Sequence, residues 1–144
     1  MQAKWLTTTL AVLFACGLGA RTAPAADWDA NLFKQAETLD LRTIGAEGEY
    51  WFPVWVVVVD DQVFVRLGSR AAERIRENQS GMELGVRVND VQFDKVQAQD
   101  APEYADRVAG AMAEKYWSDI FVRFFSHPMT LRLSVAPPAA SDRR

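Results

Sequence analysis

The stretch EYWFPVWVVVVDDQVFVRLGSR, residues 49–70, constrains the fold of this 144-residue chain more than any other part. Nine consecutive residues, from Trp51 to Val59, carry no charge, and apolar side chains occupy both alternating sets of positions. A strand with two apolar faces has to be covered on both sides. Pro53 has no N–H to donate, so pairing on that side of the strand is expected to begin after it. This segment therefore predicts a strand buried on both faces.

The same stretch continues into a hairpin, and the rest of the chain alternates between helical and strand patterns. Asp60-Asp61 is expected to form a tight turn, and Asn89-Asp90 a second one. Hydrophobic periodicity predicts helices over 27–38, 70–78 and 100–116, and strands over 39–45, 51–59, 63–67, 82–88, 91–98 and 129–135. The order is helix, three strands, helix, two strands, helix, strand.

This order favours an α+β fold that is mainly β. Two tight hairpins and a strand buried on both faces predict a six-stranded antiparallel barrel, because closing the sheet removes exposed edges. Two or three helices are expected to plug its mouth and cover its flank. Trp51 and Trp55 are expected to fill the core.

The first 25 residues have the pattern of a secretory signal. Lys4 gives a basic start, residues 6–20 form an uncharged apolar run, and Ala23-Pro24-Ala25 supplies small residues for cleavage. We therefore expect a Sec signal peptide over 1–25, a single domain over 26–136, an unfolded tail over 137–144, and a periplasmic or secreted protein. Two alternatives are an uncleaved anchor helix and a lipoprotein acylated at Cys16.

Charge and cysteine content narrow the partners of the mature domain. Removing residues 1–25 leaves 14 cations against 19 acids, a net charge of −5. An acidic domain is poorly suited to nonspecific binding of nucleic acid, so none is expected. Cys16 is the only cysteine, so the mature domain has no disulfide and depends on its core. No membrane span is expected after signal cleavage.

A candidate anion site follows the second strand of the first hairpin. Ser69 stands just before a predicted helix, whose first N–H groups and partial positive charge favour an anion. Arg66 and Arg70 add fork-shaped donors that fit a phosphate or a carboxylate. In the alternative, Ser69 only caps the helix and Arg70 pairs with Glu73 on a solvated face.

His127 and a late aromatic cluster are further candidates. His127 is the only histidine, which excludes a histidine-rich metal site; it is either a haem ligand or an ordinary loop residue. Phe121, Phe124 and Phe125 are suited to a pocket lid or a dimer contact, or to filling the core. No pair of carboxylates is spaced for general acid–base work.

The order of elements resembles the FMN-binding split barrel of the pyridoxamine-phosphate oxidase superfamily, and within it a little-characterised bacterial family. The stretches that carry the resemblance are ETLDLRTIG, PVWVVVVDDQVFVRLGSR, GVRVNDVQFDKVQA, RVAGAMAEKYW and TLRLSV. The resemblance implies a barrel that binds FMN, and a homodimer with the cofactor at its interface.

The resemblance also bears on individual residues. The superfamily often has Ser-Arg-Lys before a helix, where it holds the flavin phosphate. Ser69 and Arg70 match that motif, but Ala71 replaces the lysine. Asn78 matches an asparagine that commonly ends this helix. The resemblance thus implies cofactor binding by Arg66, Ser69 and Arg70.

Three functions remain open from the sequence. The first is an exported flavin (FMN)-binding oxidoreductase. The second is a non-enzymatic periplasmic module that has lost the flavin and binds a small planar or anionic ligand. The third is a split barrel that binds haem through His127.

Overall fold

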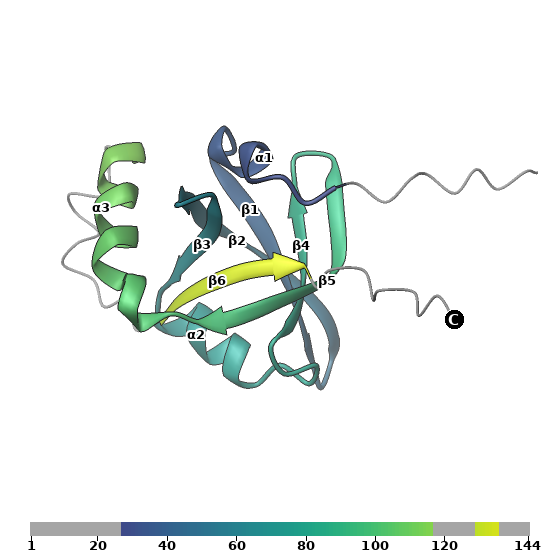
Figure 1. Cartoon of the computed structure of the whole chain (residues 1–144). Coiled ribbons are helices and arrows are strands. Elements are labelled where there is room, and N and C mark those ends of the chain that lie inside the picture. The colour runs from purple at the N-terminus through teal and green to yellow at the C-terminus, as the bar shows by residue number, and fades with distance from the viewer. Residues whose placement is uncertain (1–26, 117–128, 136–144) are drawn as a thin grey trace, which may run out of the picture.

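The computed structural model describes residues 27–116 and 129–135 (Figure 1). Residues 1–25, Cys16, the Phe121–Phe125 cluster, His127 and the tail over 137–144 lie outside them. The elements are α1 (Ala30–Lys34), β1 (Thr38–Gly45), β2 (Gly48–Val59), β3 (Gln62–Leu67), α2 (Ser69–Arg76), β4 (Glu83–Val88), β5 (Val91–Asp100), the 3-10 turn η1 (Pro102–Tyr104), α3 (Ala105–Lys115) and β6 (Met129–Val135). Their order confirms the predicted one.

The six strands form one closed antiparallel barrel. Neighbouring strands follow the order β1-β2-β3-β6-β5-β4, and β4 pairs back onto β1. Figure 1 shows α1 and α2 at opposite ends of the barrel and α3 to one side of it. The predicted mainly-β barrel with flanking helices is therefore confirmed.

The middle of β2 is buried on both faces, as its sequence predicts. Val56 is fully buried inside the barrel, and Val57, on the outer face, is 2% exposed beneath α3. On this outer side Val57 packs with Phe64 of β3 and with Val108 and Met112 of α3. The strand therefore belongs to two apolar clusters, one inside the barrel and one outside it.

The turn after β2 is tight although it contains no glycine. Asp60 and Asp61 adopt φ values of 50° and 57°, and positive φ at both central residues suits a two-residue hairpin. Short acidic side chains tolerate this conformation better than larger ones do. The predicted turn is confirmed.

The ends of the barrel are closed by the two short helices. Asp29 caps α1 by accepting a hydrogen bond from the Asn31 N–H at 2.9 Å, and the buried Phe33 ring packs against Trp28 and Phe93. Ala72 and Ile75 of α2 insert into the barrel core from the other end. α1 ends at Lys34, earlier than predicted.

Asn78, directly after α2, ties that helix to two strands. Its Oδ1 accepts from the Ile44 N–H at 2.8 Å, and its Nδ2 donates to the carbonyls of Gly81 and Glu83 at 2.8 and 3.0 Å. The side chain is 7% exposed. It therefore satisfies three partly buried backbone groups where β1 and β4 have separated.

The end of α3 closes the seam where β1 has not yet begun to pair with β2. Lys115 Nζ donates to the carbonyls of Phe33, Ala36 and Val56, at 3.3, 2.6 and 2.7 Å. The Tyr116 hydroxyl accepts from the Val56 N–H at 3.2 Å and donates to the Glu37 carbonyl at 2.5 Å. These two side chains supply the partners that a strand would otherwise supply.

Trp51 and Trp55 do not fill the barrel interior; both lie on the outer face of β2, where Trp55 packs against the apolar cluster beneath α3 and Trp51 belongs to neither cluster. The interior positions belong instead to Phe52, Val54 and Val56. Trp55 stacks on Tyr116 with the ring centroids 4.7 Å apart, and Trp51 contacts two arginines. The prediction was wrong because a two-sided apolar strand does not itself show which face is the barrel interior.

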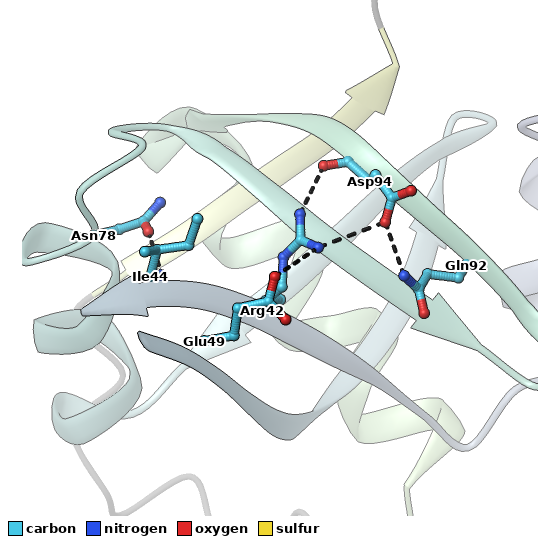
Figure 2. Close-up of polar contacts among 6 residues, drawn as sticks. All are labelled: Arg42, Ile44, Glu49, Asn78, Gln92 and Asp94. Carbon is cyan, nitrogen blue, oxygen red and sulfur yellow. Dashed lines mark hydrogen bonds and ion pairs between the residues drawn. The ribbon is translucent and has the colours of Figure 1, made fainter. Parts of the chain in front are cut away.

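The guanidinium groups of Arg42 on β1 and Arg87 on β4 both lie over the Trp51 ring, 5.5 and 4.5 Å from its centre. Figure 2 shows Arg42 reaching from β1 to β5, where it donates to the Asp94 carbonyl at 3.0 Å. A Cβ at Gly85 would lie 2.7 Å from Arg42 Nε. Glycine at this position therefore lets the arginine cross β4.

Two helix starts also differ from prediction. Ser69 is the first residue of α2; Gly68 is its N-cap, and no side chain caps it. Asp100 does not begin a helix but ends β5, where it pairs with Leu131. At Asp100 strand pairing continues to the position where a cap was expected, whereas α2 begins one residue earlier than predicted, directly after Gly68. Among the described residues, no helix is both long and apolar enough to span a membrane.

The first prediction concerns Asn78. Asn78→Ala leaves three partly buried backbone groups without their side-chain partner, so we expect the free energy of unfolding to fall by about 1–3 kcal/mol. Urea denaturation measures this. Gln79→Ala, one residue further along with an exposed side chain, should change it by no more than about 0.5 kcal/mol. Equal effects would contradict the role given to Asn78.

The second prediction concerns the Tyr116 hydroxyl. Tyr116→Phe keeps the ring on Trp55 but leaves the Val56 N–H and the Glu37 carbonyl unpaired, at an expected cost of about 1–3 kcal/mol. Tyr104→Phe is the control, because no hydrogen bond involves the Tyr104 hydroxyl within the described ranges. Denaturation curves that shift by the same amount for both variants would refute this.

The third prediction concerns pH. Burial lowers the pKa of Lys115 below its ordinary value of 10.5. For a lowered pKa the contribution to stability is fully present above 10.5 and is lost as the pH falls through the folded-state pKa. The unfolding free energy of the protein minus that of Lys115→Met should therefore rise as the pH is raised toward 10.5.

The exposed Lys95 provides the control for this pH series. The corresponding difference for Lys95→Met should stay flat over the same range. Burial also raises the pKa of Tyr116, helped by Glu37 and opposed by the hydrogen bond to Val56. Tyr116 is present in the parent protein and in both variants, so its contribution to the unfolding free energy cancels in each difference. A Lys115 difference that falls with pH would contradict the prediction.

Candidate functional site

The candidate site lies on the outer face of the barrel where β3 runs into α2. Val65 and Leu67 point into the core, so Arg66 between them lies on the outside. A hollow of about 360 Å³ opens here. It is lined by residues from β1, β2, β3 and the start of α2, namely Thr38, Pro53, Val54, Trp55, Arg66, Leu67, Gly68 and Ala71.

Arg66 brings an unsatisfied donor to this hollow. Its Nη1 is buried, and among the described residues it has no hydrogen-bond partner. Arg66 is also absent from the ion pairs within 4.0 Å that the described ranges contain. A buried guanidinium N–H without an acceptor is costly, which favours an anionic ligand at this position.

The start of α2 adds backbone donors beside Arg66. The first helical bond runs from the Ala72 N–H to the Gly68 carbonyl at 2.9 Å, so the N–H groups of Ser69, Arg70 and Ala71 have no partner within the helix. Gly68 and Ala71 both line the hollow. Free amides and the positive end of a helix next to an arginine suit a phosphate or a carboxylate.

The three residues predicted for the cofactor do not contribute equally. Arg66 lines the hollow, whereas the side chains of Ser69 and Arg70 are exposed and do not. Arg70 makes no ion pair with Glu73 within 4.0 Å, so the alternative pairing is not seen in the described part of the chain. Ala71, which stands where the superfamily motif has lysine, forms part of the wall.

The opposite wall of the hollow is apolar and is held from behind. Pro53, Val54 and Trp55 of β2 form it. Trp55 is positioned by its stack on Tyr116, which the Val56 and Glu37 backbone fix in turn. A planar or partly apolar group next to the anion position would meet this wall.

Sequence reasoning missed the positioning role of Lys115 and Tyr116. Nothing in a Lys-Tyr pair at the end of a helix indicates which carbonyls it will reach. It also placed Trp55 in the interior and not at the wall of a hollow. Asn78 was singled out only by resemblance, and the structure gives it a structural role away from the hollow (Figure 2).

We compared the sequence and the structure with known proteins. No family model matches the chain, and no curated protein matches it. The solved structure of an F420-H2 dependent reductase (FDR-A) aligns with 68% of this chain and 94% of its own length. The TM-score is 0.51 and the sequence identity 10%. At this identity the likeness shows a shared fold, and it confirms the predicted split barrel.

Proposed function

We propose that this protein is a flavin-type oxidoreductase that holds the phosphate end of its cofactor between Arg66 and the start of α2. The observation that carries the proposal is the buried Nη1 of Arg66, which has no partner among the described residues and belongs to a side chain that lines the hollow. The fold neighbour is a reductase dependent on F420-H2. Its name supports a cofactor of the flavin or deazaflavin type.

The residues present fit the phosphate end of such a cofactor. Arg66 supplies a charge-assisted donor, and the amides of Ser69, Arg70 and Ala71 supply neutral ones. Trp55 and Pro53 supply an apolar wall for the part of the cofactor that leaves the phosphate. A bound flavin would supply electron transfer to or from a substrate; the protein side would bind and orient it.

A homodimer is part of the same proposal. A hollow of about 360 Å³ lies near the lower limit for ligand sites, which are roughly 300–1,000 Å³. A second copy of the chain, packed over the hollow, would enlarge the surface that contacts the cofactor. Export through the Sec pathway remains the prediction that residues 1–25 support.

A second candidate is a non-enzymatic ligand-binding module with the same anion site. Arg66 is the only titratable residue among those lining the hollow in the described part of the chain, so no acid or base stands beside the ligand position there. Steady turnover of a dye or a quinone with reduced flavin would eliminate this candidate.

The test uses FMN and riboflavin, which share a ring system and differ in the phosphate. We expect FMN to bind and Arg66→Gln to weaken it about tenfold or more, as expected for loss of a charge-assisted contact. Riboflavin affinity should hardly change in this variant. Quenching of flavin fluorescence in a titration measures both.

Arg76→Gln is the matched control, since Arg76 is exposed at the far end of α2. It makes the same change in net charge without touching the hollow and should bind FMN normally. Protein that leaves flavin fluorescence unchanged at every concentration would overturn the proposal. So would equal weakening by the two arginine variants.

A further inference from the structure

The free edge of β2 is a second feature of the barrel. β2 has twelve residues and β3 has six. β1 pairs with β2 from Gly48 to Trp55, whereas β3 pairs only with Val56–Val59. On the side that faces β3, the first part of β2 therefore has no strand beside it among the described residues, although the barrel is closed elsewhere.

The register shows which backbone groups face this edge. Ala46 and Glu47 form a two-residue turn, so Gly45 and Gly48 are a hydrogen-bonded pair and bonded pairs alternate from there. Tyr50 and Phe52 then bond to β1, while Glu49 and Trp51 point their N–H and C=O groups away from it. Pro53 adds a carbonyl and has no N–H to leave unpaired.

Ile44 independently supports this alternation. It is opposite Glu49 in the register and should also point away from its partner strand. Its N–H bonds Asn78 Oδ1 at 2.8 Å, and its carbonyl accepts from the Gln79 N–H at 2.9 Å. Its backbone is thus turned outward from the hairpin, and Glu49 is turned outward on the other edge.

A hollow of about 430 Å³ lies beside this edge, between the hairpin tip and the second half of α2. Tyr50 forms part of it and is 47% exposed. The Arg74 guanidinium lies 3.7 Å from the centre of the Tyr50 ring. The rest of the lining comes mainly from the hairpin turn, with Gly45 and Gly48 at its ends. It also includes three carboxylates, those of Glu47, Glu49 and Glu77.

The charges of the hollow define what would occupy it. Three carboxylates line it against one arginine. Glu49 contacts Arg42 at 3.5 Å, but Glu47 and Glu77 make no ion pair within 4.0 Å in the ranges described. The single lining cation, Arg74, already rests on Tyr50. The hollow therefore favours a positively charged side chain.

We propose that the edge of β2 from Glu49 to Pro53 receives an extended basic segment of a partner protein as an added strand. Its main chain would pair with Glu49 and Trp51, and Pro53 would end the pairing. A lysine or arginine on the Tyr50 side of that segment would enter the hollow beside Glu47 and Glu77. This edge meets the Arg66 hollow only at Pro53, where the pairing would end, and strand addition to it does not depend on a flavin.

Amide hydrogen exchange tests the edge residue by residue. In the free protein the N–H groups of Glu49 and Trp51 should exchange fast, and those of Tyr50 and Phe52 slowly, because only the latter bond to β1. Saturation with a Lys-Val-Lys-Val-Lys-Val peptide should slow Glu49 and Trp51 at least about tenfold and leave Tyr50 and Phe52 unchanged. Slow exchange at all four in the free protein would overturn the proposal.

Fluorescence anisotropy with the same peptide, labelled at one end, tests the partner's chemistry. A Glu-Val repeat of equal length should not bind, and N-methylation at alternate residues of the lysine peptide should abolish binding. Glu77→Gln should weaken binding about threefold to tenfold, while Glu103→Gln, at an exposed site on η1, should not. Binding that tolerates N-methylation, or equal affinity for the acidic repeat, would refute it.

A second copy of the chain is the competing occupant of this edge. Analytical ultracentrifugation of the unliganded protein gives its oligomeric state, and amide hydrogen exchange is measured at the same protein concentrations. Together they distinguish a second copy from a partner protein. If dimer formation itself protects Glu49 and Trp51, the edge belongs to the homodimer and the peptide proposal fails. If the two amides remain fast in the dimer, the edge is open to a partner.

Discussion

Burial of the middle of β2 on both faces is the constraint on which the rest of the structure depends. Val56 has to be covered from inside and Val57 from outside. Barrel closure satisfies the first and α3 the second. Because α3 lies on the outside, its last residues reach the seam between α1, β1 and β2, where Lys115 and Tyr116 bond backbone groups that have no strand partner. The same helix thus covers the outer face of β2 and supplies hydrogen-bond partners at the seam.

Both candidate binding surfaces arise because β3 pairs with β2 only from Val56 to Val59, so that the first part of β2 has no strand paired to it on this side. After Leu67 the chain leaves the sheet and turns into α2. At that point the free amides of the helix start, Arg66 and the apolar wall of β2 meet around one hollow. Further along, the same departure leaves the Glu49–Pro53 edge without a strand. Separation of β3 from β2 therefore creates an anion position and an open edge on one barrel.

The contacts made by Arg42 and Arg87 stabilise the sheet and do not line either hollow. Arg42 of β1 and Arg87 of β4 both contact the ring of Trp51 on β2, and Arg42 also reaches Asp94 of β5 (Figure 2). These contacts join strands that are distant in sequence at the place where β4 is irregular around Gly85. These contacts bear on the register of the sheet more than on binding. Arg42 can cross β4 only where Gly85 lies opposite it, because a Cβ at that position would clash with the arginine.

The sequence by itself determined the order of the elements, the two tight turns and the two-sided cover of β2. Each of these follows from a local pattern, such as the apolar run that ends at Asp60-Asp61 or the missing N–H of Pro53. It also singled out Arg66 as a cation at the exit of the hairpin. Only the tertiary structure decided which face of β2 became the interior. That choice placed Trp51 and Trp55 outside, made Arg66 line a hollow that Ser69 and Arg70 do not, and brought Lys115 to three distant carbonyls. The physical reason is that period-two alternation is the same for both faces of an apolar strand, and closure of the barrel alone distinguishes them.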